Sequence, residues 1–325
     1  MRVAIIGAGW IAAEHSAVIG RLDGVELAAV CDIDEQRARE LAGPAPVYTD
    51  WRELYDRETP DAVFVCTPPR LHREAAVEAL GRGMHVYLEK PVARGLEDAT
   101  AIVQAAEQSE AVCAVGYQWR AVEVLDELRE ALDGQELGLL IGIGTGPTKS
   151  RPWFLNRAEG GGNLLERASH GIDLARAVAG EVVAVQATAG ANPLAQGAGE
   201  RGDIEDAAAI ALRFANGAVG STSIAWTRDG LPGKYSLDVL GSESSLHLEL
   251  DPDFTLSGVS RGREISARTN QHPIARGVER FLAAARDGDK AAVFCTPRDA
   301  AGTLAVVIAC EAALESGGTV PVDPV

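Results

Sequence analysis

Short apolar runs and amphipathic segments alternate along the first 120 residues. The apolar runs predict strands at Val3–Ile6, Glu26–Cys31, Ala62–Cys66, His85–Leu88 and Val112–Gly116. Between them, the spacing of apolar positions predicts helices at Asp34–Leu41, Leu71–Leu80 and Gly95–Ala106. Continuous Val, Ile and Ala strands separated by helices are typical of a parallel sheet covered on both faces. The pattern predicts a doubly wound α/β domain over residues 1–120.

The pattern changes after residue 120, where we expect a connecting helix at Ala121–Leu132. Two strands around Asn216-Gly217, Ala208–Phe214 and Ala218–Trp226, predict a hairpin with a two-residue turn. The remaining predictions are strands at Lys234–Leu240 and Ser244–Leu250, a loop at Thr188–Gly202, and helices at His272–Arg286 and Pro297–Leu314. Residues 121–325 are therefore expected to form a second α/β domain, an antiparallel sheet with helices on one face.

Length and charge narrow the class of protein. With 325 residues the chain is longer than one hydrophobic core usually serves, which supports two domains. Its formal net charge of -17 disfavours nucleic acid and anionic membranes as partners. No secretory leader or membrane-spanning run is predicted, and the five scattered cysteines lack metal-binding spacing. We expect a cytoplasmic protein with reduced thiols and no metal site.

A glycine-rich motif follows the first predicted strand. Gly7-Ala8-Gly9-Trp10-Ile11-Ala12 has the pattern G-x-G-x-x-A and opens the first helix. In dinucleotide-binding domains the first glycine permits a tight turn, the second lets the backbone approach a pyrophosphate, and the small third residue allows close packing. The helix N-terminus then faces the phosphates with its N–H groups. We expect Gly7, Gly9, Trp10 and Ile11 to contact a dinucleotide.

An acidic residue stands where the ribose would be bound. Asp32 ends the second predicted strand, and a carboxylate there accepts hydrogen bonds from ribose hydroxyls and repels a 2′-phosphate. This favours NAD over NADP, although Arg37 is placed to receive a 2′-phosphate. The structural alternative is an ordinary glycine turn in which Asp32 caps the next helix.

Three further motifs carry a family resemblance. They are Cys66-Thr67-Pro68-Pro69-Arg70-Leu71-His72, Leu88-Glu89-Lys90-Pro91-Val92 and the segment from Gly160-Gly161-Gly162 through Glu166 and His170 to Asp173. With the glycine loop, they make the whole chain resemble the glucose–fructose oxidoreductase / inositol dehydrogenase / rhizopine catabolism (Gfo/Idh/MocA) family. The resemblance implies a Rossmann domain followed by an α/β domain with a large, mostly antiparallel open sheet. In the family this sheet commonly forms a homo-oligomer interface, in dimers or tetramers.

Lys90 is the first candidate catalytic residue. An ammonium beside a carbon that gains or loses hydride stabilises developing alkoxide character on its oxygen. Glu89 resembles the family residue that contacts the cofactor, and Lys90 serves both cofactor and substrate there. Pro91 fixes the backbone that follows; whether the Lys90-Pro91 bond is cis is left open by the sequence. Outside this tripeptide, a solvated surface lysine would be the simpler interpretation.

His170 is the candidate proton carrier, because oxidation of an alcohol releases a proton and imidazole titrates near neutrality. On a regular helix Glu166, His170 and Asp173 would share one stripe, facing the substrate. The family pattern usually has aspartate at position 166 and glycine at 168, so Glu166 and Ala168 put the identity of the substrate in doubt. The competing interpretations are a histidine bonded within the core and a metal site.

The resemblance also points to residues along the cofactor and substrate. It implies that Thr67, Pro68 and His72 line the cofactor, although His72 can equally cap its own helix. Gln118 resembles a position near the nicotinamide. Trp153 is placed to stack on a sugar ring, and the alternative is that it only fills its loop.

The resulting hypothesis is an NAD(P)-dependent dehydrogenase or ketoreductase acting on a sugar, polyol or inositol-like substrate. The alternatives are a glycoside hydrolase that oxidises its substrate transiently and retains NAD, and a non-catalytic NAD-sensing protein. Retention of both Lys90 and His170 disfavours the sensor, which needs no acid–base pair.

Overall fold

The computed structural model describes residues 1–147, 156–190, 204–227 and 230–325. Contacts divide the chain into two compact units, the first comprising residues 1–121 and 272–301 and the second residues 122–271 and 302–325. The sequence pattern placed a boundary at residue 120 but assigned residues 272–301 to the second domain. None of the described helices is long and apolar enough to cross a membrane.

The first unit contains a six-stranded parallel sheet in the order β3-β2-β1-β4-β5-β6. Its strands are β1 (Arg2–Ile6), β2 (Glu26–Cys31), β3 (Val47–Tyr48), β4 (Ala62–Val65), β5 (His85–Leu88) and β6 (Cys113–Val115). Its helices are α1 (Trp10–Ile19), α2 (Glu35–Ala42), α3 (Trp51–Glu58), α4 (His72–Gly81), α5 (Leu96–Gln108) and α9 (Pro273–Asp287). This is the strand order of a Rossmann domain, in which ligands bind at the carboxyl edge of the sheet.

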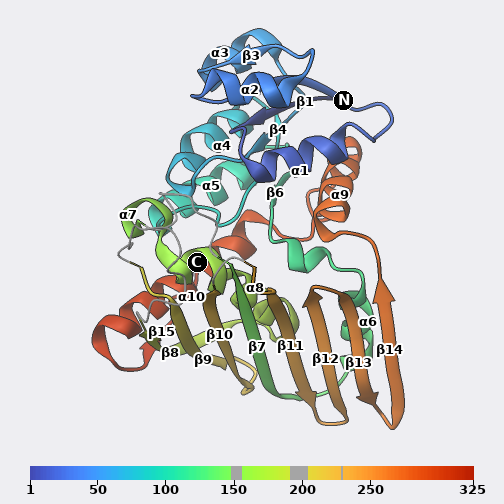
Figure 1. Cartoon of the computed structure of the whole chain (residues 1–325), viewed down its shortest axis with the longest axis vertical. Helices are drawn as coiled ribbons and strands as arrows, with labels where there is room; N and C mark the ends of the chain where they lie inside the picture. Colours follow the sequence, from blue (N-terminus) through green and yellow to red (C-terminus); the bar gives the residue numbers. More distant parts are fainter. Residues whose placement is uncertain (148–155, 191–203, 228–229) are drawn as a thin grey trace. The chain divides into compact units, whose positions relative to one another are not determined.

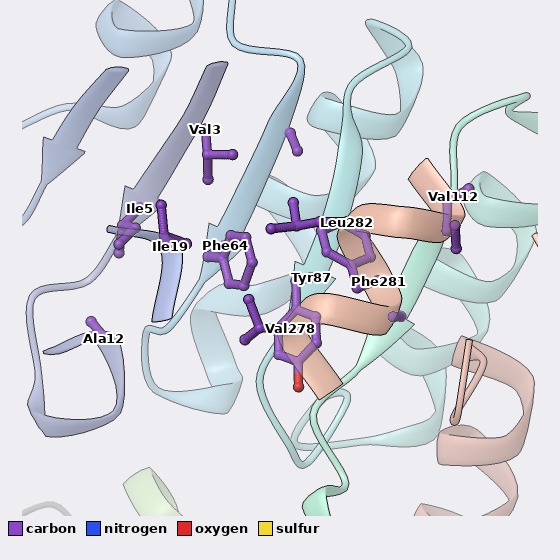
Figure 2. Packing of buried hydrophobic residues seen from close by; sticks show 13 residues of the cluster. Val3, Ile5, Ala12, Ile19, Phe64, Tyr87, Val112, Val278, Phe281 and Leu282 are labelled. Carbon is purple, nitrogen blue, oxygen red and sulfur yellow. The ribbon is translucent and has the colours of Figure 1, made fainter. Parts of the chain in front are cut away.

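Helix α9 belongs to the core of this first unit although it lies far along the sequence. Its Val278, Phe281 and Leu282 are buried against the sheet, and Figure 2 shows Phe281 beside Phe64 and Tyr87. The rings of Phe64 and Tyr87 stack at 5.0 Å, and Phe281 meets Phe64 edge-on at 5.6 Å. Hydrophobic periodicity shows that such a helix has an apolar face, but not which sheet that face covers.

The second unit contains a nine-stranded sheet in the order β14-β13-β12-β11-β7-β10-β9-β8-β15 (Figure 1). Its strands are β7 (Leu137–Pro147), β8 (Val182–Gly190), β9 (Ala207–Phe214), β10 (Val219–Thr227), β11 (Lys234–Gly241), β12 (Ser244–Asp251), β13 (Phe254–Ser260), β14 (Arg263–Thr269) and β15 (Val320–Pro321). Its described helices include α6 (Val124–Leu132), α7 (Arg157–Gly160) and α8 (Ser169–Ala179), while α10 (Pro297–Ser316) has residues in both units. All pairings are antiparallel except that of β7 with β10. The expected fold class is confirmed.

Two local predictions for this sheet were wrong. The β9–β10 connection is a three-residue loop, because Phe214 N–H donates to the Ala218 carbonyl at 3.0 Å and Gly217 adopts φ +91°. A glycine in the left-handed region after a tight turn is a common three-residue hairpin. The predicted loop also begins too early: β8 continues to Gly190, paired with β9. The rest of that prediction lies outside the described residues.

Candidate active site

The glycine loop turns between the ends of three strands. Gly7 follows β1, adopts φ +92° and donates its N–H to the Cys31 carbonyl at 2.7 Å. A Cβ at Gly7 would lie 2.7 Å from the Cys66 carbonyl oxygen. Both the backbone angle and this close approach exclude any other residue, so Gly7 is required by the protein's own packing.

Gly9, unlike Gly7, is not required by the packing of the protein itself. It is the N-cap of α1, has an extended backbone and makes no side-chain cap. A Cβ at Gly9 would find no atom within 4 Å, so nothing in the described protein demands glycine there. The space above it lies at the N-terminus of a ten-residue helix, where backbone N–H groups and the helix dipole favour an anion. Trp10 beside it is half-exposed, Ile11 is partly buried, and Ala12 packs inside.

Asp32 is fixed by the glycine loop itself. Its Oδ2 accepts the Ala8 N–H at 2.6 Å, and its Oδ1 accepts the Asp34 N–H at 2.9 Å. A carboxylate offers about four acceptor positions, so it retains capacity for ribose hydroxyls. The residue that caps α2 is Asp34, whose Oδ1 accepts from Gln36 and Arg37. The capping alternative for Asp32 is therefore wrong.

Asp34 also forms an ion pair with Arg37, the residue that the sequence placed to receive the 2′-phosphate of NADP. Arg37 Nε lies 3.1 Å from Asp34 Oδ2. Both side chains are exposed, at 66% and 43%, so this ion pair is weak and contributes little to the choice between NAD and NADP.

The loop after β4 carries Thr67, Pro68 and His72, and the structure gives His72 a different part from the one predicted. The ring is fully buried, with Nε2 2.8 Å from the Thr67 carbonyl oxygen and Nδ1 3.3 Å from that of Val92. Burial lowers the pKa of His72, so it stays neutral and donates through one nitrogen. His72 therefore neither caps α4 nor reaches the surface, and instead holds the Thr67 backbone. Thr67 and Pro68 are partly buried, as predicted cofactor contacts require.

Glu89 and Lys90 follow β5, which is adjacent to β4 in the sheet. Lys90 is partly buried, and the Lys90-Pro91 bond is cis. Glu89 is 8% exposed; its Oε1 lies 2.7 Å from His15 Nε2 and its Oε2 accepts the Lys90 N–H at 3.2 Å. Carboxyl ends of parallel strands meet at one edge, so these residues and the glycine loop share that edge. Gln118, partly buried, follows β6 at the same edge.

In the second unit the segment that carries Glu166, His170 and Asp173 is not one regular α-helix. Glu166 lies in a π-helical turn, Leu164–Ala168, where the Ser169 N–H bonds to the Leu164 carbonyl five residues earlier. The wider π-helical turn changes the angle between Glu166 and His170 from that of a regular helix, and both side chains lie near Tyr235. Both remain partly exposed, whereas Ala168 is fully buried and fills the core.

Asp173 is 1% exposed, and its predicted role on the substrate side is not supported by this position. Its Oδ1 accepts the Thr303 hydroxyl at 2.8 Å, and the Thr303 oxygen accepts from Arg176 at 2.7 Å. Arg176 is in turn bidentate to Glu181 at 2.8 Å. Asp173 thus belongs to a buried network that holds α8 to α10.

Two residues beside His170 carried no signal in the sequence. The Tyr235 ring on β11 meets the His170 ring edge-on at 6.2 Å, and its hydroxyl accepts from Arg167 at 3.1 Å. Arg167 also stacks 4.2 Å above the Trp226 ring. Burial, opposed by Arg167, raises the pKa of Tyr235 to about 12, so the phenol remains protonated. The strand pattern predicted β11, but it did not show that Tyr235 on this strand contacts His170 and Arg167.

Trp153 lies outside the described residues. In the part of the chain that the structure describes, no three His, Cys, Asp or Glu side chains gather in a way that would hold a metal ion.

Comparison with known proteins matches two parts of the chain to two models of one family. A model of the oxidoreductase family with an NAD-binding Rossmann fold matches residues 1–117, and a model of the GFO/IDH/MocA C-terminal domain matches residues 126–247. The chain is 30% identical to 1,5-anhydro-D-fructose reductase of Ensifer adhaerens, over 75% of this chain and 74% of that protein. This chain belongs to the Gfo/Idh/MocA family.

Other Gfo/Idh/MocA proteins agree with this assignment. Myo-inositol 2-dehydrogenase of Thermotoga maritima is 29% identical over 68% of this chain and 67% of its own length. Levoglucosan dehydrogenase, solved with NADH and levoglucosan, superposes with a TM-score of 0.85, covering 99% of both chains at 21% identity, which shows the shared fold. As a Gfo/Idh/MocA member, the chain is an NAD-binding oxidoreductase, and the predictions of family, enzyme class and NAD are confirmed.

The residues present fit this cofactor. Gly9 leaves room at a helix N-terminus, and Asp32 keeps acceptor capacity at the end of β2. The Thr67 hydroxyl oxygen, after β4, is buried and has no hydrogen-bond partner among the described residues. These features suit a pyrophosphate, a ribose and a further polar group of a dinucleotide.

Proposed function

We propose that this oxidoreductase transfers a hydride between NAD and a hydroxyl or keto carbon of a sugar, polyol or inositol-like substrate. The observation that carries the proposal is the place of Lys90. It is partly buried and follows β5 at the sheet edge that also holds the glycine loop. The relatives named above act on carbohydrates or polyols, which supports the substrate class.

Lys90 and His170 divide the chemistry of the substrate hydroxyl. NAD, when bound, accepts the hydride or returns it. The Lys90 ammonium stabilises the negative charge that develops on the substrate oxygen. His170 takes the hydroxyl proton or gives it back, and Glu166 orients the substrate hydroxyls or the imidazole. The protonated Tyr235 at the edge of His170 keeps that ring in place.

The test is a panel of sugars, polyols and ketosugars followed by nicotinamide absorbance. Stoichiometric reduction of NAD with one substrate class supports the proposal. Release of a free sugar from a glycoside with no net change in NAD would indicate the hydrolase that oxidises transiently. Tight NAD binding with neither reaction across the panel would indicate the non-catalytic sensor.

Asp32→Ala is expected to reverse the cofactor preference. It removes the acceptor of the ribose hydroxyls, and a hydrogen bond to a charged group is worth about 1.5–3 kcal/mol, so NAD binding should weaken about tenfold or more. Loss of repulsion should strengthen NADP binding at the same time. Calorimetric titration with both cofactors measures the ratio of dissociation constants.

Asp34→Ala is the matched control, because it removes the cap of α2 while Asp32 stays. Its melting temperature should fall with little change in NAD affinity. A wild-type protein that prefers NADP would overturn the role given to Asp32.

We also propose that the nine-stranded sheet forms a homo-oligomer interface. Thr222 is buried, and a Cβ at Gly171 of α8 would lie 2.8 Å from its hydroxyl, so α8 covers that face of β10. The alternate residues of β10 point to the opposite face of the sheet. On that face Val219 is paired with Leu139, and Leu139 with Leu240. The row continues through Ser245 to Val259.

Several side chains of this open face are exposed to an unusual degree for apolar residues. They are Ile141 at 37%, Leu240 at 39%, Val259 at 47% and Val219 at 49%. An apolar face of several strands is typical of an association surface.

Ile141→Asp is expected to dissociate the oligomer. A carboxylate buried without a partner costs several kcal/mol, which raises the dissociation constant at least about 100-fold. Sedimentation velocity measures the mass in solution. Leu231→Asp, at a position 53% exposed outside the strands, should leave the mass unchanged. Equal masses for wild type and Ile141→Asp would contradict the proposal.

A further inference from the structure

A buried pair of titratable side chains joins α1 to the end of β5. His15 of α1 is 1% exposed and Glu89 is 8% exposed. His15 Nε2 lies 2.7 Å from Glu89 Oε1. His15 occurs in no motif of the sequence analysis, and the proposed reaction does not use it.

The surroundings of His15 fix its protonation state. Its ring lies 5.4 Å from that of Phe64 and 5.1 Å from that of Tyr87, the aromatic cluster of Figure 2. Its Nδ1 is buried and has no hydrogen-bond partner among the described residues. A protonated imidazole would bury an unpaired N–H there, whereas a neutral ring leaves only a bare nitrogen. We therefore assign the neutral tautomer, in which Nε2–H donates to Glu89.

Glu89 carries the negative charge of the pair. Its titratable neighbours are Cys66, Tyr87 and His72. Burial, reinforced by Glu89, raises the pKa of Cys66 and of Tyr87, so both stay protonated. Burial lowers the pKa of His72, which stays neutral. Lys90 is the adjacent cationic residue in the chain.

Both ends of the Glu89 carboxylate are held. Oε2 accepts the backbone N–H of Lys90 at 3.2 Å. On the other side, a Cβ at Gly116 would lie 2.8 Å from Oε1, so a glycine at this position lets the chain that follows β6 approach the carboxylate closely. A side chain confined in this way transmits the position of α1 to the backbone of residue 90.

We propose that His15 is a positioning residue for Lys90. Its Nε2–H donates to Glu89, and Glu89 fixes the Lys90 amide relative to the helix that begins at the glycine loop. The N-terminal end of α1, where we propose that the phosphates bind, and Lys90 are thereby held at a fixed position relative to each other. The inference rests on the proposed role of Lys90, and it explains why a carboxylate is buried where an apolar side chain would be easier to bury.

The test uses His15→Leu, with His15→Gln as the conservative variant that retains a side-chain donor. Without a donor, the carboxylate of Glu89 loses the hydrogen bond that stabilises its charge inside the protein. At neutral pH Glu89 should then take up a proton. Infrared difference spectra should show a protonated carboxyl band in His15→Leu that is absent from His15→Leu/Glu89→Gln and from His15→Gln.

Two further measurements separate positioning from packing. Hydrogen exchange of the Lys90 amide should become faster in His15→Leu, because its acceptor has changed. On a substrate found in the panel, kcat should fall by up to about 100-fold with little change in KM.

The infrared and exchange measurements need no substrate, so they test His15 even if the panel gives no turnover. An unprotonated Glu89 in His15→Leu, or a protonated one with unchanged exchange at Lys90 and unchanged kcat, would overturn the proposal. If His15→Leu does not fold, a protonated Glu89 in the His15→Gln protein would also overturn the proposal.

Discussion

Lys90→Ala is expected to reduce turnover by about 100- to 1,000-fold, the usual cost of removing one group that stabilises developing negative charge. NAD affinity should change little, because the glycine loop and Asp32, which we propose to hold the dinucleotide, follow other strands. Lys90→Arg should recover little activity, since a planar guanidinium does not place its charge where a compact ammonium does. Steady-state kinetics and calorimetry measure the two quantities separately.

The comparison with His170→Asn distinguishes charge stabilisation from proton transfer. The loss in Lys90→Ala should persist across the pH range of the enzyme, because it removes a permanent interaction. In His170→Asn the pH dependence attributed to the imidazole should disappear, and solvent should carry the proton more slowly. A Lys90→Ala enzyme with near-normal turnover would refute the mechanism, and an unchanged pH profile in His170→Asn would remove His170 as the acid–base group.

Gly7→Ala is expected to lower both stability and NAD affinity, whereas Gly9→Ala is expected to lower NAD affinity alone. At Gly7 the added methyl group meets the Cys66 carbonyl oxygen at 2.7 Å, in a left-handed backbone conformation. Strain of this kind costs about 1–3 kcal/mol for the backbone alone, so the first unit should lose stability together with NAD binding. At Gly9 the methyl group meets nothing within 4 Å, and the backbone is extended.

Gly9→Ala should therefore keep the wild-type melting temperature and still weaken NAD binding at least about tenfold, because the methyl group occupies the approach to the helix N-terminus. Differential scanning calorimetry without cofactor, followed by NAD titration, reads both effects in the same samples. Unchanged NAD affinity in Gly9→Ala would show that the pyrophosphate is bound elsewhere.

Local periodicity predicted most of the Rossmann sheet, because buried parallel strands are continuous apolar runs bounded by helices. The strands Glu26–Cys31 and His85–Leu88 have the bounds predicted for them. The two-residue strand β3 was missed, since a pair of half-buried residues has no period. Helix α9 was recognised as a helix, but its partner sheet is a tertiary choice that its own amphipathic pattern does not contain.

Of the candidate site, the glycine loop and Asp32 were predictable because a motif with a physical reason places each residue. The geometry around His170 was not, because one π-helical turn alters the facing of every later side chain, and Asp173 turns inward. His15 was also beyond prediction: nothing in the sequence shows that residue 15 lies against residue 89.

The contribution of α9 to the first unit also affects how the protein is made. The nascent chain releases the six Rossmann strands early. Phe281 and its neighbours, which cover Phe64 and Tyr87, are synthesised only after β7 to β14, eight of the nine strands of the second sheet. At roughly 5–20 residues per second, that interval is on the order of ten seconds or more. During it, the newborn sheet exposes an aromatic surface, a substrate for chaperones and a risk of aggregation. A fragment that stops at residue 121 would keep that exposure permanently.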